Sequence, residues 1–261
     1  MDLGLTGKRA VVLAASSGLG KAVARELTRE GAVAAICSRD QARADAAAEE
    51  LRAGGAEVHA FAADVADPAS LERFLSYAVA ALGGLDLLVC NAGGPPPGGF
   101  LDLDEEAWRT GYELTLMSVV RSVRLAFPHL RDAGGGSVLV LGSSSVKQPI
   151  PNLLISNVYR PGIRALVKHL AIELAPHGVR VNMLSPGRIL TDRTRQLDAA
   201  RARREGRSEE DVRAETVAQI PLGRLGEPGE FARVAAFLLS PAASYVTGES
   251  VLVDGGMVRA L

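Results

Sequence analysis

Several hydroxyl-bearing side chains and one guanidinium lie close together in the sequence and are suited to chemistry on a carbonyl or an alcohol. Three serines form a run at 143–145, and the later stretch SNVYRPG holds Ser156, Tyr159 and Arg160. A hydroxyl can polarise a carbonyl oxygen, and an arginine adds a fixed positive charge. Ser143, Ser156 and Arg160 are therefore candidate catalytic residues, with the proton supplied by water or by the substrate. The alternative is that the serines only satisfy loop amides.

Tyr159 is a second candidate for the proton donor. If the segment is helical, three residues advance by about 300° and about 4.5 Å, so Tyr159 lies roughly 60° around the helix from Ser156 and one turn deeper. A phenol titrates near a pKa of about 10 and is a far stronger acid than an aliphatic hydroxyl. Pro161 leaves the local backbone open, and the alternative for Tyr159 is a packing or subunit-interface role.

A glycine-containing turn near the N-terminus is suited to binding phosphate. The segment AASSGLG at 14–20 lies between an apolar strand pattern and an amphipathic helix pattern. Glycine lets a backbone approach a pyrophosphate, and the first amides of a helix supply donors and positive potential. A tight turn without a ligand is the alternative, because position 14 is alanine. The candidate phosphate contacts are Ala14, Ser16, Ser17, Gly18, Leu19 and Gly20.

The end of the second predicted strand indicates which dinucleotide is bound. Folds that bind NAD place an acidic residue there for the ribose 2′-hydroxyl, whereas this chain has Ser38 and Arg39. A hydroxyl and a guanidinium suit the 2′-phosphate of NADP. Asp40 follows at once and argues for NAD, and a solvated surface charge is the alternative role of Arg39. We expect NADP, with NAD as the alternative.

Short apolar runs that alternate with amphipathic segments must position these residues. Strand patterns occupy 9–14, 32–37, 57–65, 85–93, 136–145, 179–187 and 249–256. Helix patterns occupy 20–31, 41–55, 68–82, 104–132, 155–176 and 228–240. Because a crossover between parallel strands needs a covering helix, this order predicts an α/β fold with a doubly wound parallel sheet. No linker or repeat divides the chain, so residues 1–261 are expected to form a single Rossmann-type, three-layer αβα domain.

Composition excludes several classes of partner. The chain is 48% hydrophobic and 23% charged, with a formal net charge of −1, which favours neither nucleic acid nor an anionic membrane. No apolar run typical of a signal peptide or a membrane span is seen, and the two cysteines make no disulfide framework. We expect a cytoplasmic location. The four histidines lack ligand spacing, so we expect no metal site.

The whole chain resembles the short-chain dehydrogenase/reductase family. The resemblance rests on several short stretches that occur in this order and at this spacing. They are ASSGLG (15–20), ADV (63–65), NAG (91–93), LAIELAPHGVRVNMLSPG (170–187), PLGRLGEP (221–228) and YVTGESVLVDGG (245–256). Such a resemblance implies a domain that binds NAD(P) and transfers hydride to or from a carbonyl or alcohol carbon. It also implies cofactor roles for Asp64, Val65, Asn91, Ala92, Gly93, Arg160, Pro186, Gly187, Ile189 and Thr191.

The resemblance also implies where the catalytic groups should be. The family uses a serine, a Tyr-x-x-x-Lys pair and an asparagine. An ungapped register from the LAIELAPHG block places Ser156 at the tyrosine position and Arg160 at the lysine position, and Thr115 takes the place of the asparagine. Only Ser143 is retained. A serine alkoxide is hard to reach and a guanidinium does not relay protons, so standard chemistry at full rate is not expected.

Two functions follow from this degenerate set. The first is an NADP(H)-dependent oxidoreductase acting on a small carbonyl or alcohol substrate, and the second is a nucleotide-binding sensor or oligomeric scaffold without hydride chemistry. A charged helical segment at about 190–220 corresponds to the family's substrate lid, and arginines are frequent at 193–207. That excess of arginines favours an anionic substrate, with a solvated helix face as the alternative.

The resemblance further implies a homo-oligomer, a tetramer or dimer. In it, Ile163, Leu166, Val167 and Leu170 pack either between subunits or against the sheet.

Overall fold

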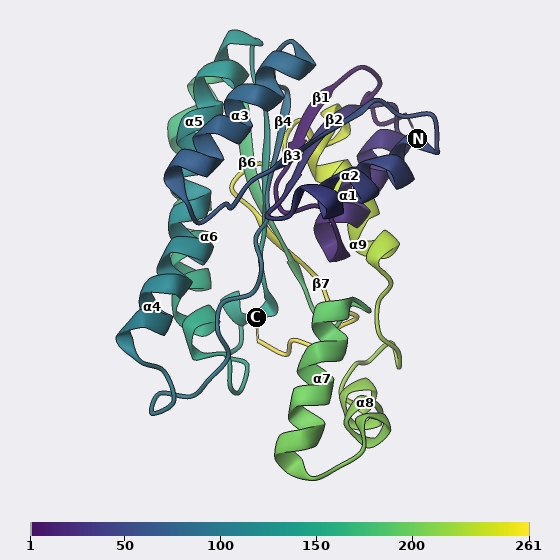
Figure 1. Cartoon of the computed structure of the whole chain (residues 1–261), viewed down its shortest axis with the longest axis vertical. Helices are drawn as coiled ribbons and strands as arrows, with labels where there is room; N and C mark the ends of the chain where they lie inside the picture. Colours follow the sequence, from purple (N-terminus) through teal and green to yellow (C-terminus); the bar gives the residue numbers. More distant parts are fainter. Residues whose placement is uncertain (1, 261) are drawn as a thin grey trace.

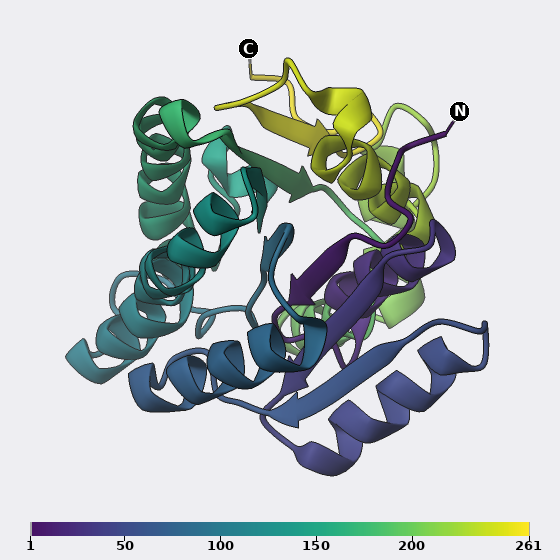
Figure 2. The same cartoon turned by 90° about the horizontal axis from the view of Figure 1, so that it is seen from above.

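A computed structural model describes residues 2–260, and these form one doubly wound α/β domain. Its seven strands are all parallel and are ordered β3-β2-β1-β4-β5-β6-β7. Seen from above, helices cover both faces of this sheet (Figure 2). The strands are β1 (Arg9–Val12), β2 (Val33–Ser38), β3 (Val58–Ala62), β4 (Leu87–Cys90), β5 (Gly136–Leu141), β6 (Val179–Pro186) and β7 (Ser250–Val253).

The strands alternate their side chains between two separate hydrophobic cores. In β1, Val11 packs in one core, and Ala10 and Val12 pack in the other, as the two-residue repeat of a strand requires. Because both faces are buried, the strands read as continuous apolar runs. The fold class expected from the sequence is therefore confirmed.

The helices divide into two layers (Figure 1). One core lies under α3, α5 and α6, and the other lies under α1, α2 and α9. In α6, Ile163 and Val167 are buried, and Leu166 and Leu170 pack beside them, so these four residues belong to the core rather than to a free face. The helices are α1 (Gly18–Arg29), α2 (Gln41–Arg52), α3 (Pro68–Leu82), α4 (Glu105–Gly111), α5 (Ser118–Asp132), α6 (Leu154–Leu174), α7 (Asp192–Glu205), α8 (Glu209–Ala218) and α9 (Pro228–Leu239).

Two regions differ from the predicted elements. The single helix expected over 104–132 is divided by a π-helical segment, η1 (Tyr112–Met117), which joins α4 to α5. π-Helical turns are rare and often occur at functional sites. The segment expected to form a lid consists of two helices, α7 and α8, which project at the lower end of the molecule in Figure 1.

Candidate active site

The turn between β1 and α1 leaves helix amides available for an anion. α1 begins at Gly18, the Ser17 hydroxyl makes no capping bond, and the first turn of the helix holds no acidic residue. A Cβ on Gly20 would lie 2.5 Å from Asn91 Nδ2 and 2.8 Å from the Ala14 carbonyl oxygen, so no larger residue fits there. Uncapped amides and a close-packed glycine fit a pyrophosphate.

Ala14 holds this turn in an unusual backbone conformation. Its φ is 47°, in the left-handed region that favours glycine. Its amide donates to Cys37 Sγ at 3.3 Å, and its carbonyl accepts from Asn91 Nδ2 at 3.0 Å. The turn is thus tied to β2 and to the segment that follows β4, where three of the predicted cofactor contacts lie, namely Asn91, Ala92 and Gly93.

At the end of β2, Arg39 and Asp40 have different environments. In the sequence, Arg39 indicated NADP and Asp40 indicated NAD. The Asp40 carboxylate caps α2 by accepting from the Arg43 amide at 3.2 Å. Arg39 is exposed, and none of the carboxylates in residues 2–260 pairs with it. Ser38 is buried beside it. The helix cap accounts for Asp40 and leaves the guanidinium available for a ligand.

The remaining predicted cofactor contacts lie in the loops after β3, β4 and β6. Asp64 accepts from the Ala66 amide at 2.9 Å, and Val65 beside it is buried. The Ile189 side chain is buried against Gly226. Thr191 caps α7, and its methyl group lies 4.0 Å from the Cβ position of Gly18. The structure therefore brings the β6–α7 loop against the turn between β1 and α1. The other predicted contacts are Ala92 and Gly93 after β4, Pro186 at the end of β6, and Gly187 directly after it.

The three serines after β5 divide their hydrogen bonds in a way that the spacing did not predict. Ser143 Oγ accepts from the Ser145 amide at 3.2 Å, which caps a short turn at 144–146. Ser156 is 5% exposed, and its Oγ lies 3.1 Å from Ser145 Oγ. Ser145 is thus the hydrogen-bond partner of Ser156. Our site prediction did not include Ser145. The only signal for it was its membership of the serine run.

Arg160 is half-buried, and its guanidinium lies next to the end of β5. Its Nη1 donates to the Leu141 carbonyl at 2.7 Å, and its Nε has no partner. Burial lowers the pKa of this guanidinium to about 10, so it stays charged at neutral pH. Thr115, which lies in η1, is 3% exposed, and its Oγ1 also has no partner among the residues described. Buried donors without partners are expected where a ligand completes the site.

Tyr159 packs against α4 and η1. Its hydroxyl donates to the Trp108 carbonyl at 3.4 Å, and its ring meets the Trp108 ring edge-on at 5.8 Å between centroids. Tyr112 lies 6.1 Å away. Ile155, on α6, is fully buried against Gly111, the last residue of α4. These contacts favour the packing role for Tyr159 over proton donation.

Most arginines of the lid are paired with carboxylates. Arg201 and Arg207 both bind Glu205 and Glu215, which ties α7 to α8. Arg195 pairs with Asp192 in the first turn of α7. For these residues the structure supports the solvated helix face rather than an anion site. Arg193 is different, because it turns toward the β4–α4 loop.

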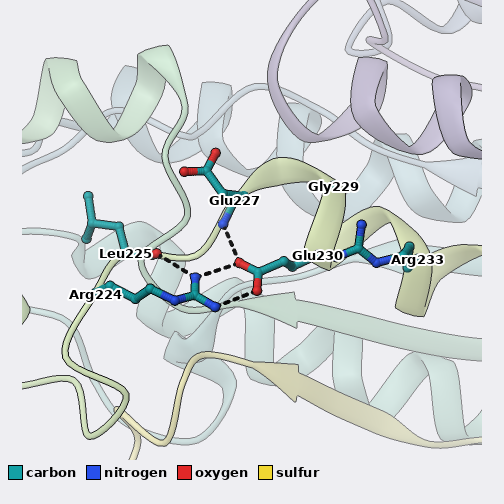
Figure 3. Close-up of a pocket in the computed structure, with 6 residues that line it drawn as sticks. All are labelled: Arg224, Leu225, Glu227, Gly229, Glu230 and Arg233. Atoms are coloured by element: carbon teal, nitrogen blue, oxygen red, sulfur yellow. Dashed lines mark hydrogen bonds and ion pairs between the residues drawn. The ribbon is translucent and has the colours of Figure 1, made fainter.

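Other parts of the described chain offer no competing site. A surface hollow at the start of α9 is lined by charged side chains, but Arg224 and Glu230 pair across it at 2.6 Å (Figure 3). None of the predicted site residues lines that hollow. Within residues 2–260, no group of His, Cys, Asp and Glu side chains is arranged to hold a metal, and no helix is both long and apolar enough to cross a bilayer.

Comparison with known proteins agrees with this architecture. A family model described as enoyl-(acyl carrier protein) reductase matches residues 13–258. Dehydrogenase/reductase SDR family member 4 from Sus scrofa is 36% identical over 258 residues, which are 98% of this chain and 89% of that protein. L-Sorbose reductase from Gluconobacter frateurii, solved with NADPH and L-sorbose, superposes with a TM-score of 0.95 at 32% identity, and all of both chains is covered.

A third similar protein is also an oxidoreductase. It is a short-chain oxidoreductase from Pseudomonas aeruginosa PAO1, whose apo structure is described as containing an atypical catalytic center. It superposes with a TM-score of 0.89 at 35% identity, covering 99% of this chain and 100% of that one. The matched family model and the length of these similarities show that this chain belongs to the short-chain dehydrogenase/reductase family.

Proposed function

We propose that this protein is an NADP(H)-dependent oxidoreductase that acts on a carbonyl or alcohol carbon with a reduced set of catalytic groups. The observation that supports this best is Arg160, a buried guanidinium with an unfilled donor, at the strand end that also carries Ser143. Across the site, the start of α1 offers uncapped amides for a pyrophosphate. The sorbose reductase that this chain resembles was solved with NADPH.

The side chains of the site would divide the work as follows. NADPH, when bound, supplies the hydride. Arg160 holds the ribose next to the nicotinamide and places positive charge near the reacting oxygen, while the Ser143 hydroxyl donates a hydrogen bond to that oxygen. Ser156 is an aliphatic alcohol held by Ser145 and is too weak an acid to replace a phenol. The proton therefore comes from water or from the substrate, and turnover is slow compared with an enzyme that has a tyrosine.

The burial of Ser156 also favours a second candidate, a nucleotide-binding sensor or scaffold without hydride chemistry. With its hydroxyl turned to Ser145, the site lacks a protein acid at the family's tyrosine position. A scaffold without hydride chemistry would be expected to fill its pocket with side chains such as those of Ile155 and Tyr159. Both of these side chains instead pack on α4 and η1. We favour the enzyme.

NADPH oxidation over a panel of ketones separates the two candidates. We expect measurable turnover, and we expect Ser143→Ala to lower kcat/KM by about 100-fold because an oxyanion donor is lost. Ser156→Ala and Tyr159→Phe should each change kcat/KM by less than about threefold, since their hydroxyls bond within the protein. No turnover together with tight NADPH binding would establish the sensor. Equal activity of Ser143→Ala and the unmodified protein would remove Ser143 from the mechanism.

The choice of cofactor can be tested at Arg39. Replacing it with alanine should weaken NADPH binding by about 10- to 100-fold and leave NADH binding nearly unchanged, because only NADPH carries the 2′-phosphate. Arg43→Ala on the next helix is a matched control, since it removes the same charge but leaves the end of β2 intact. Fluorescence titration of both nucleotides gives the dissociation constants. Equal losses for NADPH and NADH would contradict recognition of the 2′-phosphate.

We further infer the role of α7 and α8, the oligomeric state and the cellular location of the protein. α7 and α8 act as a substrate lid on the single domain, and the chain forms a homo-oligomer, a tetramer or dimer. The exposed Ile172 on α6 is available for such packing, at 70% exposure. A cytoplasmic location suits the two buried free thiols, Cys37 and Cys90. Light scattering on the purified protein measures the subunit number.

A further inference from the structure

Arg193 is the arginine of the lid's first turn that reaches across the site instead of pairing on the surface. Its Nη2 donates to the Pro95 carbonyl at 3.4 Å. A Cβ on Gly94 would lie 2.7 Å from that nitrogen and 3.0 Å from Cζ, so the guanidinium rests directly on Gly94. No carboxylate in residues 2–260 lies within ion-pair distance of it. Desolvation by the loop lowers its pKa, although part of the side chain stays exposed.

The sheet order shows what lies beneath this contact. Gly94 follows β4 and Arg193 follows β6, and β5 lies between these two strands. The two loops in contact therefore follow the strands on either side of β5. Ser143 follows the end of β5, and the last carbonyl of β5, at Leu141, accepts from Arg160. A cation without a counter-ion thus links the loops that flank the strand end where the two groups that we assign to the reacting oxygen are found.

The chemistry of Arg193 suggests what it binds. A partly desolvated guanidinium that has only one long bond to a carbonyl keeps most of its donors for a ligand, and a planar fork of donors matches a carboxylate or a phosphate. Arg195, Arg201 and Arg207 are paired with Asp192, Glu205 and Glu215, whereas Arg193 in the first turn of α7 keeps an uncompensated charge.

We propose that Arg193 forms an anion subsite over the reacting carbon, and that the substrates are oxo acids or hydroxy acids rather than neutral ketones and alcohols. This inference rests on the proposed function, since it names the substrate class of the same site. α7 brings the guanidinium to the substrate, and the Gly94–Pro95 backbone positions it there while its remaining donors bind the anion.

Binding to the oxidised complex tests the proposal without turnover, because NADP+ cannot reduce a ketone. The protein saturated with NADP+ is titrated by calorimetry with pyruvate, acetoacetate and 4-oxopentanoate, each compared with its methyl ester. We expect at least one acid to bind 10-fold or more tightly than its ester. Arg193→Met should abolish that preference, with NADP+ affinity retained. Arg203→Met on the same helix removes an equal charge from an exposed position and should leave the preference intact.

A second variant moves the guanidinium without removing its charge. Gly94→Ala places a methyl group where Arg193 now rests, and it should lower the acid preference about as much as Arg193→Met. Absence of any acid preference would overturn the proposal, and so would a loss of NADP+ affinity in Arg193→Met, which would assign the residue to the cofactor pyrophosphate. If neutral ketones oxidise NADPH but no acid binds preferentially, the subsite fails and the proposed function stands. If an acid binds preferentially but no substrate turns over, the anion subsite stands and the proposed oxidoreductase function fails.

Discussion

At the scale of single residues, Ala14 carries backbone strain that the turn between β1 and α1 imposes. An alanine at a φ of 47° costs about 1 kcal/mol relative to glycine in the same conformation, and the greater freedom of glycine in the unfolded chain offsets part of that cost. We expect Ala14→Gly to stabilise the protein by roughly 0.5 kcal/mol and to raise Tm by about 1–2 °C.

Differential scanning calorimetry measures this shift, and Asn152 provides the matched control. Asn152 also has a positive φ, of 60°, but asparagine tolerates that region well. Asn152→Gly should therefore leave Tm unchanged or slightly lower. A lower Tm in Ala14→Gly than in the unmodified protein would show that the alanine side chain contributes more by packing than its backbone costs.

The elements that carry the candidate site residues were predictable, whereas the roles of those residues stay predictions. The apolar patterns indicate β5 and α6, and these elements place Ser156 against Ser145 and Arg160 against the Leu141 carbonyl. The partner of Ser156 was not predictable, because it depends on how the turn at 144–146 directs each hydroxyl. The unpaired donors of Arg160 and Thr115 were hidden for the same reason, since burial of single atoms has no sequence signal.

At the scale of elements, the long helix over 104–132 shows what periodicity misses. The pattern WRTGYELTLMS predicts continuous helix, and the backbone is continuous, but η1 inserts extra residues into its turns. That insertion shifts the register between α4 and α5, and it leaves Thr115 buried beside α6. A π-helical turn depends on tertiary contacts with α6, which lies far along the chain, so local propensity cannot reveal it.

The two helices α7 and α8, which we propose as a lid, are held together by a network of ion pairs that should weaken in acid. Glu215 binds Arg201 at 2.6 Å and Arg207 at 2.5 Å, and these bonds lower the pKa of Glu215. A lowered carboxyl pKa means that the stabilisation is present above the ordinary glutamate value and is lost as pH falls through the lowered value. We expect amide hydrogen exchange in 192–218 to speed up between pH 5 and pH 3, relative to the chemical rate.

Glu215→Gln should produce the faster exchange already at pH 7, because it removes the charge that both arginines share. Glu210→Gln, on the exposed side of the same helix, is the control and should leave exchange unchanged. Mass spectrometry of the lid peptides measures the rates. If both variants exchange like the unmodified protein, then apolar contacts, such as those of the buried Val212, hold α8 and the ion pairs do not.

At the scale of the whole molecule, alternating strand and helix patterns were sufficient to predict the fold, because a parallel sheet allows few arrangements of such elements. The sequence could not show how the two halves of the sheet are joined. Arg9 begins β1, and Asp86 precedes β4, where the winding of the sheet reverses. The Arg9 side chain binds Asp86 through Nε at 2.8 Å and Nη2 at 3.1 Å, and the Arg9 amide donates to the same carboxylate at 2.9 Å.

This pair should make global stability depend on pH. Burial disfavours the charged carboxylate, but the bonds from Arg9 outweigh burial, so the pKa of Asp86 lies below its usual range. The stabilisation is therefore complete above about pH 4 and is lost as pH falls through the lowered pKa. Asp86→Asn should cost roughly 1–3 kcal/mol at pH 7. The loss of stability in Asp86→Asn relative to the unmodified protein should shrink toward pH 3, as measured by urea unfolding across a pH series.

Asp132→Asn is the control, because it removes an exposed ion pair and should change stability by less than about 0.5 kcal/mol at every pH. A deficit in Asp86→Asn that stays constant from pH 7 to pH 3 would show that the shape of the buried contact, and not its charge, joins the two halves of the sheet.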